Sequence, residues 1–593
     1  MSVTTLAELF RVAVSHDRAD CLQHKVDGAY RPISSAELGT RVRTLATALD
    51  AWGIRPGDRI ALMAENGPAW PIVDFAAQAI GAVSVPVYAT LLPEGAAYVI
   101  RDSGARVVFA QGQERLEGLL ARRRELPDVD RWIGIEAPPL DGSAALEQIL
   151  AGGVAAEPAE FDAWLSRARP EDVATLIYTS GTTGDPKGVM LTHANITSNV
   201  VACSGILPIR KEWTALSFLP LAHSLERTVD YLYFYFGIGV AYAESVKTLS
   251  QNLLEVRPHI FASVPRVYEK VREAVLEKVE AEGGLHKWIF DWALAAGRRA
   301  LPRRLGFDEL GVRARIADRL VFSKIRARFG GRFEYAISGG APLGREVAEF
   351  FWGAGIPLLE GYGLTETSPV VAVNTPRAVR LGTVGKPIPD VDVKIADDGE
   401  ILTRGPNIMK GYFNHPGATA EVLERDGWFH TGDIGELDAD GFLKITDRKK
   451  ELIVNAYGKN IAPAPIENAL KGGRFVAQAV IVGDQRPFLV ALIVPNFEAL
   501  RGFAAAHHLG DDPERWIESE DLRALVQREI DRVNQHHERY EQVRAFQLLP
   551  REMTLESGEL TPTLKVKRRV VNRNYKEVLD RLYDQSDLAR HGG

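Results

Sequence analysis

The chain has 593 residues, more than one hydrophobic core usually holds, so two or more domains are expected. Hydrophobic residues make up 46% and charged residues 25%, as in an ordinary globular protein, and the formal net charge of −7 argues against a dedicated nucleic-acid binder. The two cysteines, Cys21 and Cys203, lack metal-ligand spacing, which favours a reducing compartment without a disulfide framework.

The sequence predicts neither a signal peptide nor a transmembrane segment. The first ten residues include Glu8 and have no long apolar core. The uncharged, aromatic-rich run 231–243 is shorter than the roughly 20 apolar residues that span a bilayer. We therefore expect a buried core element there and a cytoplasmic protein, with peripheral contact to a membrane left open.

The first section of the chain alternates helical and strand patterns. Apolar residues recur at helical spacing over 36–51, with Ser35 as the expected N-cap, and short apolar runs at 59–64 and 82–87 predict strands. Repeated βα units favour a largely parallel sheet with helices on its faces. Residues 112–170 are richer in charge and proline, so we expect a peripheral connection there.

Residues 178–188, Tyr-Thr-Ser-Gly-Thr-Thr-Gly-Asp-Pro-Lys-Gly, follow an apolar run and contain almost no apolar side chain. This pattern predicts a buried strand that ends in a polar loop. The backbone N–H groups, the hydroxyls and Lys187 suit a polyphosphate, although the Gly-Lys-Ser/Thr of a P-loop is missing. Thr192 is the expected cap of the next helix.

Two later strands also end in glycine-rich polar turns. The strand 333–338 precedes Gly339-Gly340-Ala341-Pro342, and the run 358–360 precedes Gly361-Tyr-Gly-Leu-Thr-Glu-Thr367. Because the carboxyl ends of parallel strands gather at one edge of a sheet, we expect the three loops to form one ligand site there. Between them, the charged region of about 270–330 predicts a solvated helical insertion.

Beyond residue 380 the pattern changes to short strands and turns. Residues 438–441 predict a hairpin turn, and five consecutive charges at 447–451 mark a boundary. We therefore expect an N-terminal domain at 1–447 and a small α+β C-terminal domain at 448–593. The latter contains a strand hairpin at 476–494, a helical stripe at 522–533 and a final amphipathic helix.

In this order and spacing, the motifs resemble those of the adenylate-forming (AMP-binding) superfamily over nearly the whole chain, and within it the long-chain fatty acid–CoA ligase branch. The resemblance implies an acyl-CoA synthetase-like α/β fold. This fold has a large N-terminal domain of parallel-rich sheets covered by helices, a β-subdomain and a small mobile C-terminal domain. The motifs are 178–188, 339–342, 361–367, 431–433, 447–451 and the lysine at 565.

The resemblance implies a two-step reaction that uses ATP, Mg²⁺ and coenzyme A. A long-chain fatty acid attacks the α-phosphate of ATP to give acyl-AMP and pyrophosphate, and the thiol of coenzyme A then takes the acyl group. Cations and donors must neutralise the charge that develops when an anion meets a polyanion.

By resemblance, several groups of residues bind the nucleotide. Tyr362 stacks on adenine, Asp433 binds the ribose hydroxyls, Arg448 contacts the nucleotide, Thr365 contacts the α-phosphate and Glu366 holds Mg²⁺. The residues around the phosphates are Thr179, Ser180, Gly181, Thr182, Thr183, Gly184 and Lys187, and those around the base are Gly340, Ala341, Pro342, Glu360, Gly361, Tyr362 and Gly363.

The resemblance also implies residues for the remaining steps. Lys565 is the adenylation lysine and acts with Thr365 and Glu366, although Leu564 replaces the glycine common in relatives and Lys567 is the alternative. The other assignments are Lys450 at the hinge, Gly458 and Lys459 at the entry of coenzyme A, and His223 at the acyl pocket.

Each site has a structural alternative. Gly/Ser/Thr clusters are commonly solvated loops, Asp433 fits an ordinary turn, and a lone histidine such as His223 is more often structural. For Lys449 we expect an exposed linker residue.

Two other functions remain open on the sequence alone. One is a fatty acyl-AMP ligase that loads a carrier protein, and the other is a non-catalytic nucleotide- or lipid-binding protein. The sequence decides neither the acyl chain length nor the oligomeric state.

Overall fold

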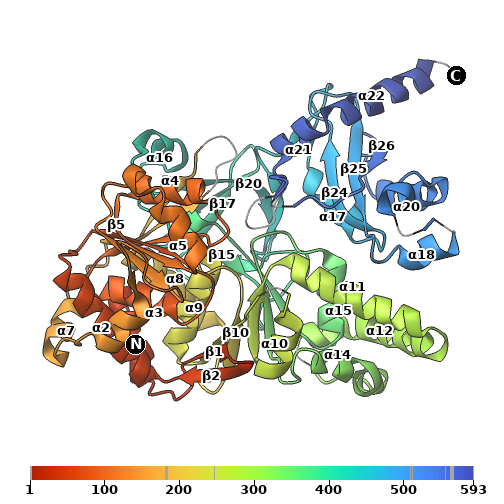
Figure 1. Ribbon diagram of the computed structural model, residues 1–593. Helices are drawn as coiled ribbons and strands as arrows, with labels where there is room; N and C mark the ends of the chain where they lie inside the picture. Colours follow the sequence, from red (N-terminus) through yellow and green to blue (C-terminus); the bar gives the residue numbers. More distant parts are fainter. Residues whose placement is uncertain are drawn as a thin grey trace.

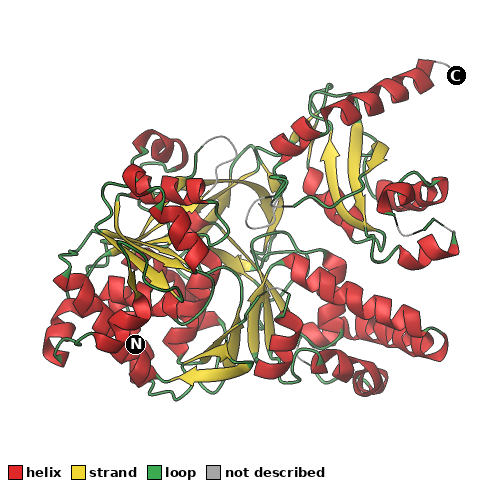
Figure 2. Ribbon diagram, viewed as in Figure 1, coloured by secondary structure: helices red, strands yellow, loops and turns green. Residues whose placement is uncertain are grey.

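The computed structural model describes residues 3–179, 185–245, 247–306, 308–507, 509–510, 512–554, 556–560 and 566–591. Figure 1 shows a large part built from the N-terminal three quarters of the chain and a smaller C-terminal part beside it, and Figure 2 shows that both parts combine sheets and helices.

An eight-stranded sheet lies in the N-terminal region, in the order β19-β9-β8-β4-β3-β5-β6-β7. Its strands are β3 (Arg59–Met63), β4 (Val83–Val87), β5 (Ala105–Gln111), β6 (Arg131–Ile135), β7 (Ala144–Ala145), β8 (Val173–Thr179), β9 (Lys187–Thr192) and β19 (Gly411–Tyr412). Side chains alternate between two cores along β3. Ile60 and Leu62 pack into the larger core with the helix residue Phe75, whereas Ala61 and Met63 pack into a second core.

A second sheet has nine strands, in the order β16-β15-β14-β13-β12-β10-β11-β1-β2. Its strands are β1 (Leu22–Val26), β2 (Ala29–Ile33), β10 (Thr214–Ser217), β11 (Gly239–Tyr242), β12 (Ile260–Ser263), β13 (Tyr335–Ser338), β14 (Leu358–Gly363), β15 (Val370–Val373) and β16 (Lys386–Pro387). The five central strands from β14 to β11 are parallel, as the repeated βα pattern predicts.

A four-stranded antiparallel sheet follows, in the order β17-β18-β20-β21. Its strands are β17 (Asp392–Ile395), β18 (Glu400–Arg404), β20 (Phe429–Leu437) and β21 (Leu443–Arg448). The predicted hairpin turn joins β20 to β21, with Gly441 at a φ of +81°, a conformation that favours glycine.

The C-terminal part contains a three-stranded sheet, β24-β25-β26, and a two-stranded sheet, β22-β23. Their strands are β22 (Ile453–Val454), β23 (Asn460–Ile461), β24 (Val476–Val482), β25 (Leu489–Pro495) and β26 (Val543–Leu548). Core residues of the larger part extend to Leu443, and those of the smaller part begin at Ile453. The predicted division between residues 447 and 448 falls in this interval and stays a prediction.

The helices of the N-terminal region are α1 (Leu6–Ser15), α2 (Ser35–Ala51), α3 (Ala69–Ala79), α4 (Pro93–Ser103), α5 (Gln113–Leu120), α6 (Leu146–Gly152), α7 (Pro158–Leu165), α8 (His193–Ile206), α9 (Ser224–Phe236) and α10 (Leu249–Val256). Those of the insertion are α11 (Pro265–Glu282), α12 (Gly284–Leu305), α13 (Val312–Ala317), η2 (Asp318–Phe322) and α14 (Ser323–Ala327). Later helices are α15 (Arg345–Gly353), η3 (Thr365–Thr367), α16 (Pro416–Val422), α17 (Pro463–Lys471), α18 (Arg501–Ala506), α19 (Pro513–Trp516), α20 (Glu520–Asn534), α21 (Arg568–Asn574) and α22 (Lys576–His591).

Two local expectations are corrected. The hydroxyl of Ser34, not that of Ser35, caps α2 by accepting from the N–H of Glu37 at 3.1 Å. Residues 112–170 are not a peripheral connection, because β6 pairs with β5 inside the sheet and buries Trp132 and Ile133. Thr192 caps α8 as predicted.

The α/β fold class, with a large N-terminal part and a small α+β C-terminal part, is confirmed. Residues 231–243 form the buried end of α9 and the strand β11, as expected. Within the described residues, no helix has the length and apolar content that crossing a membrane requires.

Candidate functional site

The predicted phosphate loop closes a hairpin of two antiparallel strands. β8 ends at Thr179, β9 begins at Lys187, and these two residues are register partners. The Nζ of Lys187 lies 5.3 Å from the centroid of the Tyr412 ring. The remaining predicted phosphate-binding residues lie outside the described part of the chain: Ser180, Gly181, Thr182, Thr183 and Gly184.

The short helix η3 carries the predicted Thr365–Glu366 pair. The Tyr412 hydroxyl donates a hydrogen bond to Oε1 of Glu366 at 2.9 Å, and the hydroxyls of Ser224 and Thr365 lie 3.2 Å apart. Since Tyr412 contacts both Glu366 and Lys187, it joins the loop after β14 to the phosphate-loop hairpin. Sequence reasoning missed both residues: Tyr412 belongs to no identified motif, and Ser224 follows His223 but was given no role.

These loops do not share one sheet edge, so that expectation is wrong. The phosphate-loop hairpin belongs to the eight-stranded sheet, the loops after β13 and β14 to the nine-stranded sheet, and Asp433 to the four-stranded sheet. The strand β8 pairs with β4 and β9 rather than with a strand of the larger sheet. The predicted site is therefore assembled where separate sheets meet.

The loop after β13 presents the predicted adenine-binding residues. Gly340, Ala341 and Pro342 are exposed, and Gly340 has a φ of +80°. Next to them, the N–H of Leu343 donates to Oε1 of Glu360 at 3.1 Å. Burial raises the pKa of Glu360 to about 8, although the N–H of Leu343 favours the ionised form.

The carboxylate of Asp433 is buried and engaged at both oxygens. The hydroxyl of Tyr362 donates to Oδ2 at 2.7 Å, and Nε of Arg448 donates to Oδ1 at 3.0 Å. Burial acts to lower the pKa of Arg448, but Asp433 and Glu451 raise it above its usual value. Ribose hydroxyls that bound Asp433 would have to share or displace these donors, and the predicted stacking by Tyr362 stays a prediction.

The two glycines that flank Tyr362 meet different surroundings. A Cβ on Gly363 would lie 1.7 Å from the carbonyl oxygen of Pro369, whereas one on Gly361 would lie 3.4 Å from the Val373 side chain. Gly363 therefore serves a close backbone approach inside the protein.

The charged segment after β21 has distinct surroundings at each residue. Lys450 is exposed in a turn, where the hinge is predicted. Lys449 is exposed in the same turn, as expected, and its Nζ also forms ion pairs with Asp398 at 2.6 Å and Glu400 at 2.9 Å. Burial raises the pKa of Asp447 to about 6.

In the C-terminal part, Lys565 lies outside the described residues, and its role stays a prediction. Lys567 is described, and its N–H donates to the carbonyl of Glu559 at 2.8 Å at the start of α21. Gly458, at a φ of +74°, and Lys459 occupy an exposed turn. The Nζ of Lys459 lies 6.0 Å from the centroid of the Tyr540 ring.

His223 is the N-cap of α9. Its Nδ1 accepts a hydrogen bond from the N–H of Leu225 at 3.1 Å. This contact gives the half-buried imidazole a structural role at the helix start. Its predicted place in the acyl pocket stays a prediction.

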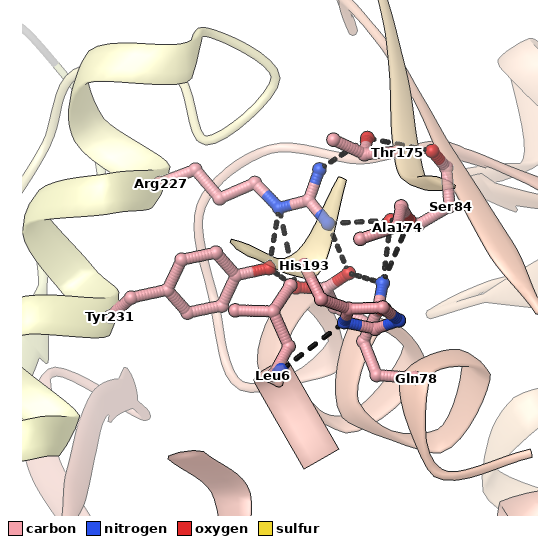
Figure 3. Close-up of polar contacts among 9 residues, drawn as sticks. Leu6, Gln78, Ser84, Ala174, Thr175, His193, Arg227 and Tyr231 are labelled. Carbon is pink, nitrogen blue, oxygen red and sulfur yellow. Dashed lines mark hydrogen bonds and ion pairs between the residues drawn. The ribbon is translucent and has the colours of Figure 1, made fainter. Parts of the chain in front are cut away.

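A buried ion pair joins α9 to α3 (Figure 3). It was not predicted from the sequence. The guanidinium of Arg227 pairs with Asp74 of α3 and donates to Oγ1 of Thr175 at 2.8 Å and to the hydroxyl of Tyr231 at 2.9 Å. Both charged side chains are less than 5% exposed. Thr175 lies on β8, so Arg227 ties α9 to the strand that leads into the phosphate loop.

The predicted Mg²⁺ position has one protein carboxylate. Within the described ranges, no group of three or more His, Cys, Asp or Glu side chains is arranged to hold a metal. Oε2 of Glu366 makes no hydrogen bond with a described residue, while Oε1 accepts from Tyr412. One free carboxylate oxygen suits a hard cation that is otherwise held by phosphate oxygens and water.

Comparison with known proteins identifies the family. A family model described as AMP-binding enzyme matches residues 10–413, and a model of the AMP-binding enzyme C-terminal domain matches residues 450–587. The chain is 38% identical over 595 residues to the long-chain-fatty-acid–CoA ligase FadD15 of Mycobacterium bovis, with 96% of each chain covered. It is 31% identical to human long-chain-fatty-acid–CoA ligase 1, covering 98% of this chain and 87% of the relative.

Among solved structures, the fold is similar to the adenylation domain of a carboxylate reductase from Mycobacterium chelonae. The TM-score is 0.76 at 24% identity, covering 98% of this chain and 91% of the other. The similarity spans both parts of the chain. The chain belongs to the AMP-binding enzyme family.

Proposed function

We propose that the protein is a long-chain fatty acid–CoA ligase that works through an acyl-AMP intermediate. Relatives with that name, at 38% and 31% identity over nearly their whole length, support the substrate class. The observation that carries the reaction type is the convergence of Lys187 and Glu366 on Tyr412, because it brings the phosphate-loop hairpin to the predicted metal-binding residue.

In the first step, a carboxylate oxygen of the fatty acid forms a bond with the α-phosphorus of ATP. The bond between that phosphorus and the oxygen that bridges to the β-phosphate breaks, and pyrophosphate leaves with both electrons. In the second step, the sulfur of coenzyme A forms a bond with the acyl carbon, the bond between that carbon and the phosphate oxygen breaks, AMP leaves with both electrons, and the thiol proton passes to water. Both steps depend on positioned reactants and on neutralised negative charge.

The described residues supply several of these functions. Lys187 provides positive charge at the base of the phosphate hairpin, and Thr365 offers a hydroxyl whose position is fixed by Ser224. Glu366 would hold Mg²⁺, which neutralises phosphate charge when bound. Asp433 offers a buried carboxylate to the ribose, where Arg448 and Tyr362 keep it oriented.

We assign the adenylation step to Lys565, which would bridge the incoming carboxylate and the α-phosphate. Residues 448–593 would then move as a domain about Lys450, so that Gly458 and Lys459 face the thiol substrate in the second step. The separate hydrophobic cores on either side of residues 447 and 448 support this division. Two buried free cysteines fit a reducing, cytoplasmic location.

A substrate-panel exchange assay tests the proposal. The purified protein should incorporate labelled pyrophosphate into ATP in the presence of palmitate and much less with acetate or benzoate, and should then form palmitoyl-CoA. Exchange that responds only to short or aromatic acids would contradict the substrate class. Acyl transfer to a carrier protein but not to coenzyme A would favour the acyl-AMP ligase alternative, and no exchange with any acid would favour a binding protein.

A further inference from the structure

A continuous helical segment, formed by α13, η2 and α14, carries an outward-facing apolar stripe. Val312, Ile316 and Leu320 are 64%, 47% and 48% exposed. Because they are four residues apart, they lie on one face of the helix. Ala314 and Ala317, between these residues in the sequence, are buried. Large aliphatic side chains normally face the core of a protein. In this segment, three of them face solvent instead.

Cations border this stripe. The single acid of the segment, Asp318, is not available to them, because it pairs with Arg304 at 3.1 Å and Arg326 at 2.7 Å. The bordering cations are all exposed and have no ion-pair partner among the residues that the structure describes: Arg313, Arg315, Arg319, Lys324 and Arg328. This face therefore carries uncompensated positive charge on a chain whose formal net charge is −7.

The neighbouring helix α12 also has exposed apolar and cationic side chains. Leu285 and Trp288 near its start are 68% and 65% exposed, and Arg299 and Arg303 toward its end are exposed. Figure 1 shows α12 and α14 on the side of the nine-stranded sheet away from the eight-stranded sheet. An exposed tryptophan and long cationic side chains suit a boundary between an apolar and an aqueous phase.

We propose that this basic–apolar face, defined by Val312, Ile316 and Leu320 and their bordering cations, docks on a bilayer surface that contains anionic lipids. Aliphatic side chains between arginines enter the boundary between headgroups and acyl chains, while the guanidinium groups bind lipid phosphates. A nucleic acid would neutralise the cations but leave the three aliphatic side chains unburied. The inference goes beyond the proposed reaction and does not depend on it.

Co-sedimentation of the full chain with sonicated vesicles tests this inference. The protein should bind phosphatidylglycerol–phosphatidylcholine vesicles and release as ionic strength rises, with little binding to pure phosphatidylcholine. The triple variant Arg313→Gln/Arg315→Gln/Arg319→Gln should bind on the order of 100-fold more weakly, from the contribution of each surface cation. The triple variant Val312→Ser/Ile316→Ser/Leu320→Ser should lose roughly tenfold or more.

Matched control variants replace residues of the same types elsewhere on the surface. The variants Arg31→Gln/Arg124→Gln/Arg425→Gln and Leu92→Ser/Val154→Ser/Leu254→Ser replace exposed residues and should bind as the wild type does. Circular dichroism should show the same thermal unfolding for all variants. Equal vesicle binding by the wild type and both test variants would overturn the inference, as would binding to RNA without binding to vesicles.

Discussion

The hydroxyl of Tyr412 donates a hydrogen bond of 2.9 Å to Oε1 of Glu366, a residue 46 positions earlier in the chain. The same ring lies against Lys187. One tyrosine thus fixes the distance between the predicted metal-binding carboxylate and the phosphate-loop hairpin. Its hydroxyl and its ring can be tested separately.

Replacing Tyr412 by phenylalanine keeps the ring beside Lys187 and removes the donor to Glu366. A hydrogen bond to a charged group contributes about 1.5 kcal/mol or more, so pyrophosphate exchange should fall roughly tenfold. A titration with Mg²⁺ should show a higher requirement for the metal. Tyr30→Phe, which removes a hydroxyl bonded to the carbonyl of Tyr242, is the control. An unchanged Mg²⁺ requirement in Tyr412→Phe would argue against the coupling.

Lys565 and Lys567 can be separated by the half-reactions. Lys565→Ala should lower acid-dependent pyrophosphate exchange by roughly 100-fold, because one donor to the developing charge is lost, while thioester formation from preformed acyl-AMP persists. Lys567→Ala should retain exchange, since the contact described for Lys567 uses its backbone N–H. The opposite pattern would assign adenylation to Lys567.

The buried carboxyl of Glu360 makes stability depend on pH. With its pKa raised to about 8, the folded state holds a proton that the unfolded state, with a pKa of about 4.3, releases. The unfolded state thus binds fewer protons between these values. Stability should therefore fall as pH rises from about 5 to 8, by about 1.4 kcal/mol per pH unit from this group at most.

The variant Glu360→Gln keeps an acceptor for the N–H of Leu343 and removes the titration. Denaturant unfolding at pH 5, 6.5 and 8 should show a flatter pH dependence for the variant, with a relative gain at pH 8. Parallel curves for the two proteins would mean that Glu360 does not titrate in this range.

The two glycines of the motif 361–363 can be compared as a matched pair. Gly363→Ala places a Cβ 1.7 Å from a backbone oxygen, which only a backbone shift can relieve, so we expect a loss of about 3 kcal/mol or more. Gly361→Ala meets the side chain of Val373 at an ordinary contact distance and should lose little. Thermal unfolding followed by circular dichroism measures both. Similar midpoints would contradict the close approach.

Breaking the buried pair of Arg227 and Asp74 should be costly. Arg227→Met leaves the Asp74 carboxylate unpaired away from water, which destabilises by about 3–5 kcal/mol. Arg380→Met removes a pair with Asp438 and Asp440 at the surface and should cost about 1 kcal/mol or less. Urea unfolding of both variants measures the loss in the free energy of unfolding. Equal losses would contradict the contribution of burial.

Local patterns predicted the features that depend on neighbouring residues. The cap at Thr192, the turn before β21 and the polar loops after buried strands need only a few adjacent positions. The order of the motifs along the chain led to the family resemblance, and this resemblance implied the fold class and the site residues. The helix cap shifted from Ser35 to Ser34, because serine occupies both positions and either hydroxyl could serve.

Pairs that are distant in sequence could not be predicted. Tyr412 meets Glu366 and Arg227 meets Asp74 because elements of separate sheets are packed together, whereas Ser224 meets Thr365 because β10 and β14 belong to one sheet. The assignment of all three loops to one sheet edge failed for the same reason, since periodicity identifies strands but not their partners. Residues 112–170 were wrongly expected to be a peripheral connection, because their many charged residues obscure the apolar pattern of the buried strand β6.

The ion pair in Figure 3 also limits which movements the protein can make. It links α9 to α3 and β8, so a movement of these elements relative to one another would leave a buried charge without its partner. The movement that we propose between the two half-reactions would therefore involve the chain beyond β21. In that proposal, the N-terminal part keeps its internal packing while the smaller C-terminal part changes its position.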